Sequence, residues 1–150
     1  MSSIEMLHRE VIETIYRHAE ATYPEECCGF IFADSNVHCG KNIQNQLNRL
    51  APGVYQRSAS SGYTLSIDDT LLLNRSLHSE NPARIIYHSH PDVGAYFSRE
   101  DEDKALFMGQ PIYPVAYLVI DVRSGKAKGA KLFEWNAEKF VCSQEFPGCP

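Results

Sequence analysis

The sequence predicts a mixed α/β (α+β) fold, with a mixed central β-sheet flanked by helices and an antiparallel C-terminal meander. Apolar residues recur at helical spacing between residues 4 and 22, which indicates an amphipathic helix. The apolar run ARIIYHSH (83–90) is typical of a buried central strand. Three further strand-like runs follow near the C-terminus, at 114–122, 126–135 and 139–145. Helices before and between groups of strands are typical of a mixed architecture.

The remaining elements are predicted from turn residues and apolar spacing. The first helix ends at TYPEE, whose proline cannot continue it. CCGFIFA (27–33) is expected to form a buried strand, and VHCGKNIQNQ (37–46) its hairpin partner. Residues 47–62, rich in Ser, Gly, Pro and Asn, are expected to form a functional surface loop. Three elements complete the prediction: a strand at 63–67, a helix at 68–80 that starts with a capping Asp68, and a helix at 98–109 with Gly109 at its end.

Length and composition bound the class of protein. A chain of 150 residues can bury one substantial core, so a single domain over 1–150 is expected. No apolar stretch approaches the roughly 20 residues of a membrane helix, and the N-terminus lacks the apolar region of a secretory signal. A formal net charge of -5 disfavours a nucleic-acid partner held by phosphate neutralisation. We therefore expect neither a membrane nor a nucleic acid as partner.

The cysteines favour a reducing compartment. They are odd in number, no pair has C-x-x-C spacing, and no export signal accompanies them. Free thiols in a cytoplasmic protein are therefore expected, rather than a disulfide framework or a cysteine-based zinc site. The sequence does not decide the oligomeric state, and a homodimer is compatible with it.

The segment HSHPDVGAYFSREDED (88–103) contains the residues best suited to chemistry. In a strand, residues two apart project from one face, so His88 and His90 would lie side by side. A catalytic zinc needs three protein ligands and one open position, and imidazole is a common ligand. A third ligand must then come from elsewhere, and the acidic run SREDED (98–103) is close enough to supply it.

The same residues also have a purely structural interpretation. Ser98 and Asp101 have the spacing of a capping box, and acidic residues in a first helical turn favour the helix dipole without any metal. A histidine pair alone is as compatible with a structural role as with metal binding. The joint spacing, His88-x-His90 followed after seven residues by Ser98-x-x-Asp101, favours the metal site.

That combination resembles the signature H-x-H-x7-S-x-x-D of the JAMM (MPN+, Mov34/PAD-like) zinc metalloprotease family, at all four positions. The family also carries a glutamate in a P-x-E-x-C/A-G turn, which PEECCG (24–29) matches at Glu26. The resemblance covers nearly the whole chain, and its compact length is similar to the small prokaryotic members. It implies the cytidine-deaminase-like MPN fold.

The resemblance also implies roles for individual residues. His88, His90 and Asp101 would hold one zinc ion per chain, with Glu26 as the general acid/base and Ser98 as a stabiliser of the oxyanion. Zinc lowers the pKa of its bound water to about 7, which makes this chemistry feasible at neutral pH. An alignment slip of one residue would exchange Glu26 with Glu25.

The substrate implied by the resemblance is the C-terminal tail of a ubiquitin-like protein. The first hypothesis is a zinc peptidase or isopeptidase that cleaves at that tail, in deconjugation or tail processing. An alternative is the processing of a ubiquitin-like sulfur carrier, with release of a C-terminal amino acid such as cysteine. A second alternative is a non-catalytic module that binds the tail. Residues 44–62 and 92–97 are expected to line the groove for it.

Overall fold

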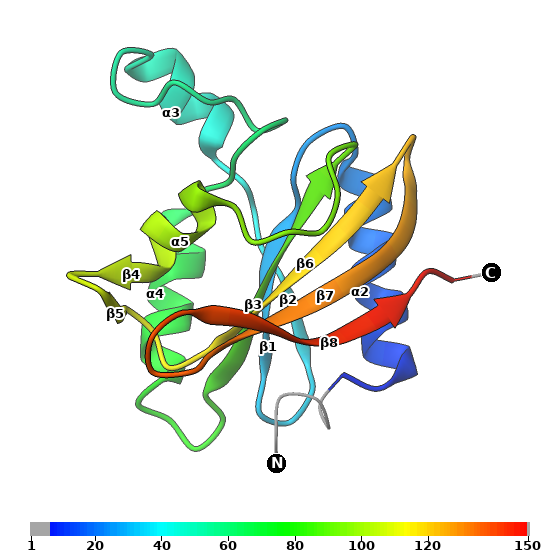
Figure 1. Cartoon of the computed structure of the whole chain (residues 1–150). Helices are drawn as coiled ribbons and strands as arrows, with labels where there is room; N and C mark the ends of the chain where they lie inside the picture. Colours follow the sequence, from blue (N-terminus) through cyan, green and yellow to red (C-terminus); the bar gives the residue numbers. More distant parts are fainter. Residues whose placement is uncertain (1–6, 150) are drawn as a thin grey trace.

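The computed structural model describes residues 7–149 and contains a six-stranded mixed sheet with helices on both faces (Figure 1). Its strands are β1 (Cys28–Phe32), β2 (Val37–Cys39), β3 (Ala83–Pro91), β6 (Ala116–Arg123), β7 (Lys126–Trp135) and β8 (Phe140–Pro147). The helices are α2 (Arg9–Thr22), α3 (Gln44–Leu50), α4 (Ile67–Ser76) and α5 (Arg99–Ala105). Strands β4 (Leu106–Phe107) and β5 (Gln110–Pro111) form a separate hairpin.

The strand order β2-β1-β3-β6-β7-β8 places β3 near the centre of the sheet. β3 pairs antiparallel with β1 and parallel with β6, whereas β6, β7 and β8 form an antiparallel meander. The predicted mixed α+β class and its C-terminal meander are therefore confirmed.

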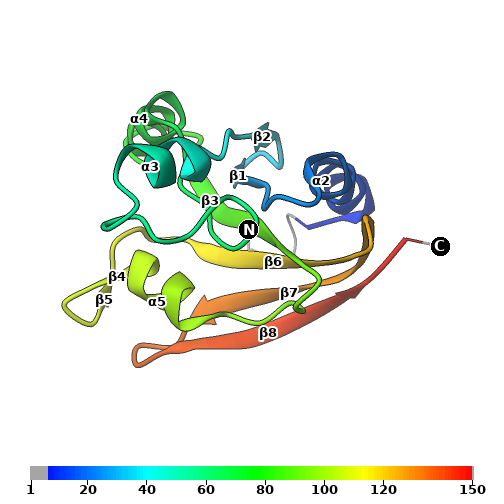
Figure 2. The same cartoon turned by 90° about the horizontal axis from the view of Figure 1, so that it is seen from above.

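The sheet separates two apolar cores. In Figure 2, α2 lies at the right of the molecule, and α4 and α5 lie at the left. Ile85 and Tyr87 of β3 belong to the core under α2, whereas Ile86 belongs to the core that contains Leu73 of α4 and Ala105 of α5. Because side chains alternate along a strand, His88 projects toward the same face as Ile86.

The register between β1 and β3 brings distant parts of the chain together. Cys28 pairs with His88, and the neighbouring Cys27 receives a hydrogen bond from the Ser89 backbone and donates its own N–H to the Ser89 Oγ at 2.8 Å. Paired residues of antiparallel strands share a face of the sheet. The residue two positions before Cys28, Glu26, therefore lies on the same face as the two histidines.

The first helix and the first hairpin are shorter than predicted. α2 begins at Arg9, and residues 4–6 of the predicted helix lie outside the described residues. The predicted partner strand 37–46 is wrong beyond Cys39, because the chain leaves the sheet there and forms α3. The predicted loop 47–62 correspondingly loses its first residues to this helix.

Asn42 explains why this segment leaves the sheet. Its side-chain amide donates to the carbonyls of Glu26 and Gly62 at 2.9 and 3.0 Å, and its side-chain oxygen accepts the N–H groups of Gln44 and Thr64. Side-chain hydrogen bonds of this kind replace the backbone bonds that a strand ladder would make. They also tie the loop to the end of β1.

The predicted strand at 63–67 is wrong. The segment makes a single antiparallel bridge at Leu65, and α4 begins directly after Ser66. Ser66 rather than Asp68 is the N-cap, because its Oγ accepts the N–H of Asp69 at 3.1 Å. Asp68 lies in the first helical turn, where its charge suits the helix dipole.

The prediction that α5 continues to Gly109 is also wrong. The helix ends at Ala105, whose carbonyl accepts the N–H of Ile112 at 2.8 Å from the returning chain. Gly109 instead lies in the β4–β5 turn with φ +78, a left-handed conformation that glycine adopts without steric cost. Across residues 7–149, we find no helix whose length and apolar character would let it traverse a lipid bilayer.

Candidate metal centre

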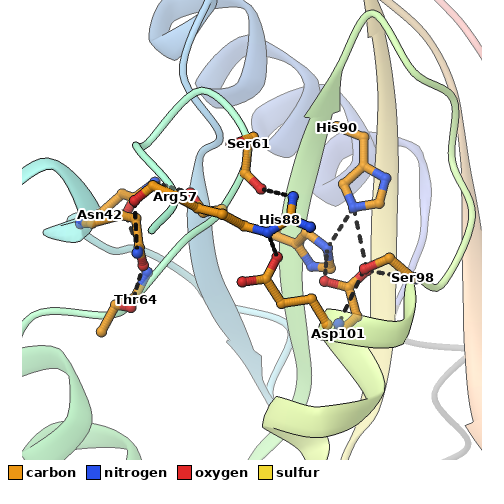
Figure 3. A network of polar contacts seen from close by, with 11 residues as sticks. Asn42, Arg57, Ser61, Thr64, His88, His90, Ser98 and Asp101 are labelled. Atoms are coloured by element: carbon orange, nitrogen blue, oxygen red, sulfur yellow. Dashed lines mark hydrogen bonds and ion pairs between the residues drawn. The ribbon is translucent and has the colours of Figure 1, made fainter. Parts of the chain in front are cut away.

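β3 carries both histidines on the face that α4 and α5 cover. The His88 and His90 side chains are buried, with 0% and 4% relative exposure, and their Nε2 atoms lie 3.1 Å apart (Figure 3). The Nδ1 of His90 lies 2.9 Å from the Gly94 carbonyl oxygen. Donation of the Nδ1 proton to that carbonyl leaves the Nε2 of His90 with a free lone pair, which is the tautomer that a metal requires.

α5 brings a carboxylate to the two histidines. Asp101 Oδ1 lies 3.1 Å from the Nε2 of His88, and Oδ2 lies 3.3 Å from the Nε2 of His90. The same residue completes a capping box: the Ser98 N–H donates to Asp101 Oδ2 at 2.9 Å, and the Asp101 N–H donates to Ser98 Oγ at 3.1 Å. The carboxylate that caps α5 is therefore the same one that faces the two imidazoles.

The acidic neighbours of Asp101 do not join this cluster. Glu100 lies beside Arg57, with Oε2 2.7 Å from the arginine Nε, and Asp103 is exposed. Residues on a short helix that are not three or four positions apart point in different directions. Asp101 is therefore the acidic residue of α5 that reaches the histidines.

Glu26 supplies the fourth group of the cluster. One ligand atom each of Glu26, His88 and His90 lies within 4.8 Å of the others, and the glutamate is buried. Its backbone N–H donates to the Ala59 carbonyl at 2.7 Å, which fixes it beneath the loop. Glu25 instead accepts a hydrogen bond from Asn45 at 2.6 Å. The structure therefore places Glu26, and not its neighbour, beside the histidines.

The buried charges are arranged so that the two carboxylates titrate very differently. Burial raises the pKa of Glu26 to about 7, against the opposing attraction of His90. Burial also favours the neutral acid of Asp101, but the charge and hydrogen bonds of the two histidines outweigh it, and the pKa of Asp101 lies well below its ordinary value. Asp101 is therefore ionised at neutral pH, whereas Glu26 exchanges its proton near neutrality.

The histidines respond to the same surroundings. Burial lowers the pKa of His88, which favours the neutral ring that metals bind. For His90, the hydrogen bond and charge of Asp101 outweigh burial and raise the pKa. A metal bound at the Nε2 atoms would therefore displace a proton from the cluster.

The donor set fits a tetrahedral metal such as zinc. Zinc binds imidazole nitrogen and carboxylate oxygen at about 2.0–2.2 Å, so two of its tetrahedral ligand atoms lie about 3.3 Å apart. The two Nε2 atoms of His88 and His90 lie 3.1 Å apart, and they lie 3.1 and 3.3 Å from the Oδ1 and the Oδ2 of Asp101, respectively. Within residues 7–149, the buried Nδ1 of His88 has no hydrogen-bond partner, so the ring meets the cluster only through Nε2. Glu26 is placed to act next to these three donors.

The cluster opens into a cavity of about 340 Å³. The cavity is bounded by the loop after α3, through Arg57 and residues 60–62, and by the loop after β3, through Val93 and Tyr96. Both segments fall within the ranges expected from the sequence to line a groove. Glu26, His90, Ser98 and Asp101 also line this cavity.

Two further residues of the site escaped the sequence analysis. Tyr63, expected in a strand, stacks on the His88 ring with a centroid distance of 4.6 Å. Lys104 also lines the cavity, and its Nζ lies 4.3 Å from the centroid of the Tyr63 ring. The spacing of Asp101 and Lys104, three residues on one helix, was the available signal for the lysine. No local signal places Tyr63 at the site, because its loop crosses the site only in the folded chain.

Two buried imidazoles and two buried carboxylates therefore meet at one cavity of a mixed α+β fold. This arrangement is a candidate histidine–carboxylate metal centre. The chain matches the family model of prokaryotic homologs of the JAB domain over residues 8–137. The chain belongs to this family. The resemblance to small prokaryotic JAMM/MPN proteins is therefore confirmed as family membership. A comparison with curated protein sequences gave no match.

Solved structures show the same fold. A protein from Desulfitobacterium hafniense, known from a solution structure, is 18% identical with a TM-score of 0.63, and the match covers 91% of this chain and 87% of that one. A solution structure of a protein from Salinibacter ruber is 21% identical with a TM-score of 0.56, and the match covers 95% of this chain and 91% of that one. At these identities the likeness concerns the fold alone.

Proposed function

We propose that the chain is a zinc-dependent peptidase or isopeptidase that cleaves at the C-terminal tail of a ubiquitin-like protein. The observation that carries this proposal is that His88, His90 and Asp101 lie within 3.1 to 3.3 Å of one another beside the buried Glu26, whose pKa is raised to about 7, at one cavity. A site with structural histidines alone has no need of a fourth, readily protonated group beside it.

The metal would be held by His88, His90 and Asp101. When bound there, zinc supplies Lewis-acid chemistry, which acidifies water and polarises a carbonyl. The capping box holds Asp101 in place through two hydrogen bonds to Ser98. Because α5 and β3 are both packed on the core, the ligands need little reorganisation when the metal binds.

Glu26 is the proton carrier of the proposed reaction. A pKa of about 7 lets its carboxylate accept a proton from the attacking water and return it to the departing amine. Its burial beneath the loop restricts the carboxylate to the cavity side, where the histidines lie.

Ser98 is suited to stabilise the oxyanion. Its Oγ accepts the Asp101 N–H, and among residues 7–149 its own hydroxyl proton donates to no protein acceptor. The hydroxyl proton is thus available to a substrate oxygen in the cavity, which Ser98 lines. The serine acts as helix cap through its lone pair and as donor through its proton, so the two roles do not compete.

An extended tail ending in Gly-Gly suits the entrance of this cavity. The exposed apolar side chains Leu50, Val54 and Tyr55 lie in α3 and the loop that follows it, and Val93 and Tyr96 lie in the loop after β3. Glycines lack side chains and pass narrow openings, and the exposed Val93 and Tyr96, which line the cavity, are available to the residues before the glycines. Charge reversal or deletion within residues 47–60 is expected to weaken substrate binding.

The experiment that tests this proposal combines metal analysis with cleavage. The purified chain is loaded with zinc and incubated with a ubiquitin-like protein fused through its C-terminal Gly-Gly to a short peptide, and the products are weighed by mass spectrometry. We expect one zinc per chain, cleavage after the second glycine, and loss of cleavage with a chelator.

The matched variants are Glu26→Gln and Glu25→Gln, which remove the same charge from adjacent positions. The first is expected to abolish turnover and retain zinc, and the second to retain both. Binding of the fusion without cleavage by the zinc-loaded wild type would favour the non-catalytic module instead. Wild-type turnover by Glu26→Gln would refute the assigned base.

A further inference from the structure

The two histidines of the candidate metal centre are held in different ways. The His90 ring has a hydrogen-bond partner on its outer side, because its Nδ1 lies 2.9 Å from the Gly94 carbonyl oxygen. The buried Nδ1 of His88 has none within the described part of the chain, residues 7–149. A histidine that binds a metal almost always uses its second nitrogen for an outer hydrogen bond, which fixes the orientation of the ring. The orientation of the His88 ring must therefore be fixed by another contact.

Tyr63 supplies a contact of this kind. Its ring stacks on the His88 ring with a centroid distance of 4.6 Å and an interplanar angle of 24°. Both side chains are buried, with 7% relative exposure for Tyr63 and 0% for His88. The His90 ring is also near, but it is tilted by 60° to the His88 ring. A nearly parallel ring in a close-packed site limits the rotation of the imidazole, so Tyr63 constrains His88 where a hydrogen bond does not.

Asn42 fixes the backbone on both sides of Tyr63 (Figure 3). Its side-chain amide donates to the Gly62 carbonyl at 3.0 Å, and its side-chain oxygen accepts the Thr64 N–H at 3.1 Å. The same amide donates to the Glu26 carbonyl at 2.9 Å. One asparagine therefore holds both the residue that stacks on a proposed ligand and the backbone of the proposed base.

Lys104 holds the Tyr63 ring from α5. Its Nζ lies 4.3 Å from the centroid of that ring, and a cation over an aromatic face is attracted to it. Lys104 follows the proposed ligand Asp101 by three residues, so both side chains leave the same face of the helix. Tyr63 therefore contacts β3 through His88 and α5 through Lys104, the two elements that carry the three proposed ligands.

We propose that Tyr63 is a positioning residue of the metal centre, whose flat ring holds the His88 imidazole with its Nε2 directed at His90 and Asp101. Stacking replaces the outer hydrogen bond that His88 lacks. A ring that is already oriented loses less freedom when a metal binds, so this contact raises the metal affinity. The inference rests on the metal centre of the proposed function and is independent of the bond that the site cleaves.

The test compares Tyr63→Phe, which keeps the flat ring, with Tyr63→Leu, which keeps an apolar side chain without it. Zinc affinity is measured by competition with a chromogenic chelator. Tyr63→Leu is expected to bind zinc about 10-fold more weakly than the wild type, the lower end of the usual effect of residues that orient metal ligands. Tyr63→Phe is expected to stay within about 2-fold of the wild type, because stacking is a property of the ring and not of the hydroxyl group. If Tyr63→Leu does not fold, Tyr63→Met takes its place.

A matched control and a spectrum separate positioning from general packing. Tyr117 is also buried, but its ring packs against Phe97 and Phe140 rather than against a proposed ligand. Tyr117→Leu is therefore expected to lower the free energy of unfolding of the metal-free chain and to keep the zinc affinity. Cobalt bound in place of zinc reports the ligand geometry through its visible absorption bands. At saturating cobalt these bands are expected to change in Tyr63→Leu and to match the wild type in Tyr63→Phe and Tyr117→Leu.

The outcomes separate this inference from the proposed function. Wild-type zinc affinity and an unchanged cobalt spectrum in Tyr63→Leu would overturn the role of Tyr63 while the metal centre and the hydrolysis stand. An equal loss of affinity in Tyr63→Phe or in Tyr117→Leu would also overturn it, because the effect would then belong to the hydroxyl group or to the core. The expected pattern of affinities in a chain that binds zinc but cleaves no tail would support this inference and refute the hydrolase. A wild type that binds no zinc would refute both.

Discussion

The buried carboxylate of Glu26 makes the stability of the metal-free protein depend on pH in an unusual direction. Burial raises its pKa to about 7 from an ordinary value of 4.5. Between these two values the native state holds a proton that the unfolded chain has already released. Because the native state binds more protons there, the free energy of unfolding decreases as the pH rises through this window.

The size of the effect follows from the same interval. Each pH unit between the two pKa values corresponds to about 1.4 kcal/mol, so an ionised Glu26 costs the native state roughly 3 kcal/mol above pH 7. Glu26→Gln removes the ionisable proton and keeps the volume of the side chain. The free energy of unfolding of the variant is therefore expected to rise by about 2.5 kcal/mol relative to that of the wild type when the pH is raised from 5 to 8.

Urea unfolding at pH 5 and pH 8 in the presence of a chelator measures this difference directly. The quantity compared is the free energy of unfolding of the variant minus that of the wild type, because the other titrating groups largely cancel in it. Glu25→Gln serves as the control, since it removes the same charge from the adjacent, partly exposed position.

A difference that stays constant within about 1 kcal/mol between the two pH values would refute the reasoning. It would mean that the carboxylate of Glu26 is solvated in the native state, and that it lacks the buried position from which its proton-transfer role is argued.

Three further predictions concern the metal ligands, the serine and the metal itself. Asp101→Asn is expected to weaken zinc binding by at least about 100-fold in a competition assay with a chromogenic chelator, whereas Asp103→Asn, at an exposed position, leaves it unchanged. Ser98→Ala is expected to lower the free energy of unfolding by about 1 kcal/mol through loss of the cap and to lower kcat by about 10²- to 10³-fold. Ser98→Gly is expected to keep most of the stability, because glycine is tolerated as an N-cap, and to show the same loss of kcat. Equal losses of stability in Ser98→Ala and Ser98→Gly would contradict the divided role of this serine. Zinc at about 1,000 times its Kd is expected to stabilise the chain by about 4 kcal/mol in thermal unfolding, and an unchanged Tm after chelation would contradict a metal centre.

The elements that carry the proposed metal ligands were predictable because their signals are local. His88 and His90 share a face of β3 by the alternation of a strand, and a capping box fixes Asp101 at the start of α5. Both arrangements depend on residues within a few positions of one another. The segment 40–66 was predicted less well, because Asn42 bonds to residues up to twenty-two positions away and no local pattern reports such bonds.

The sequence by itself determined that two imidazoles lie side by side at the end of a buried strand and that a carboxylate follows on a capped helix. Its motif also pointed to Glu26, but by resemblance alone. Only the tertiary structure decided between Glu26 and Glu25, because the two face opposite sides of the chain and the register of β1 against β3 selects which side meets the histidines. The same packing brought Lys104 and Tyr63 together over His88. The alternation of side chains along a strand and the capping of a helix depend on a few neighbouring residues. A cavity, in contrast, is formed by segments that are distant in the sequence and come together only when the chain folds.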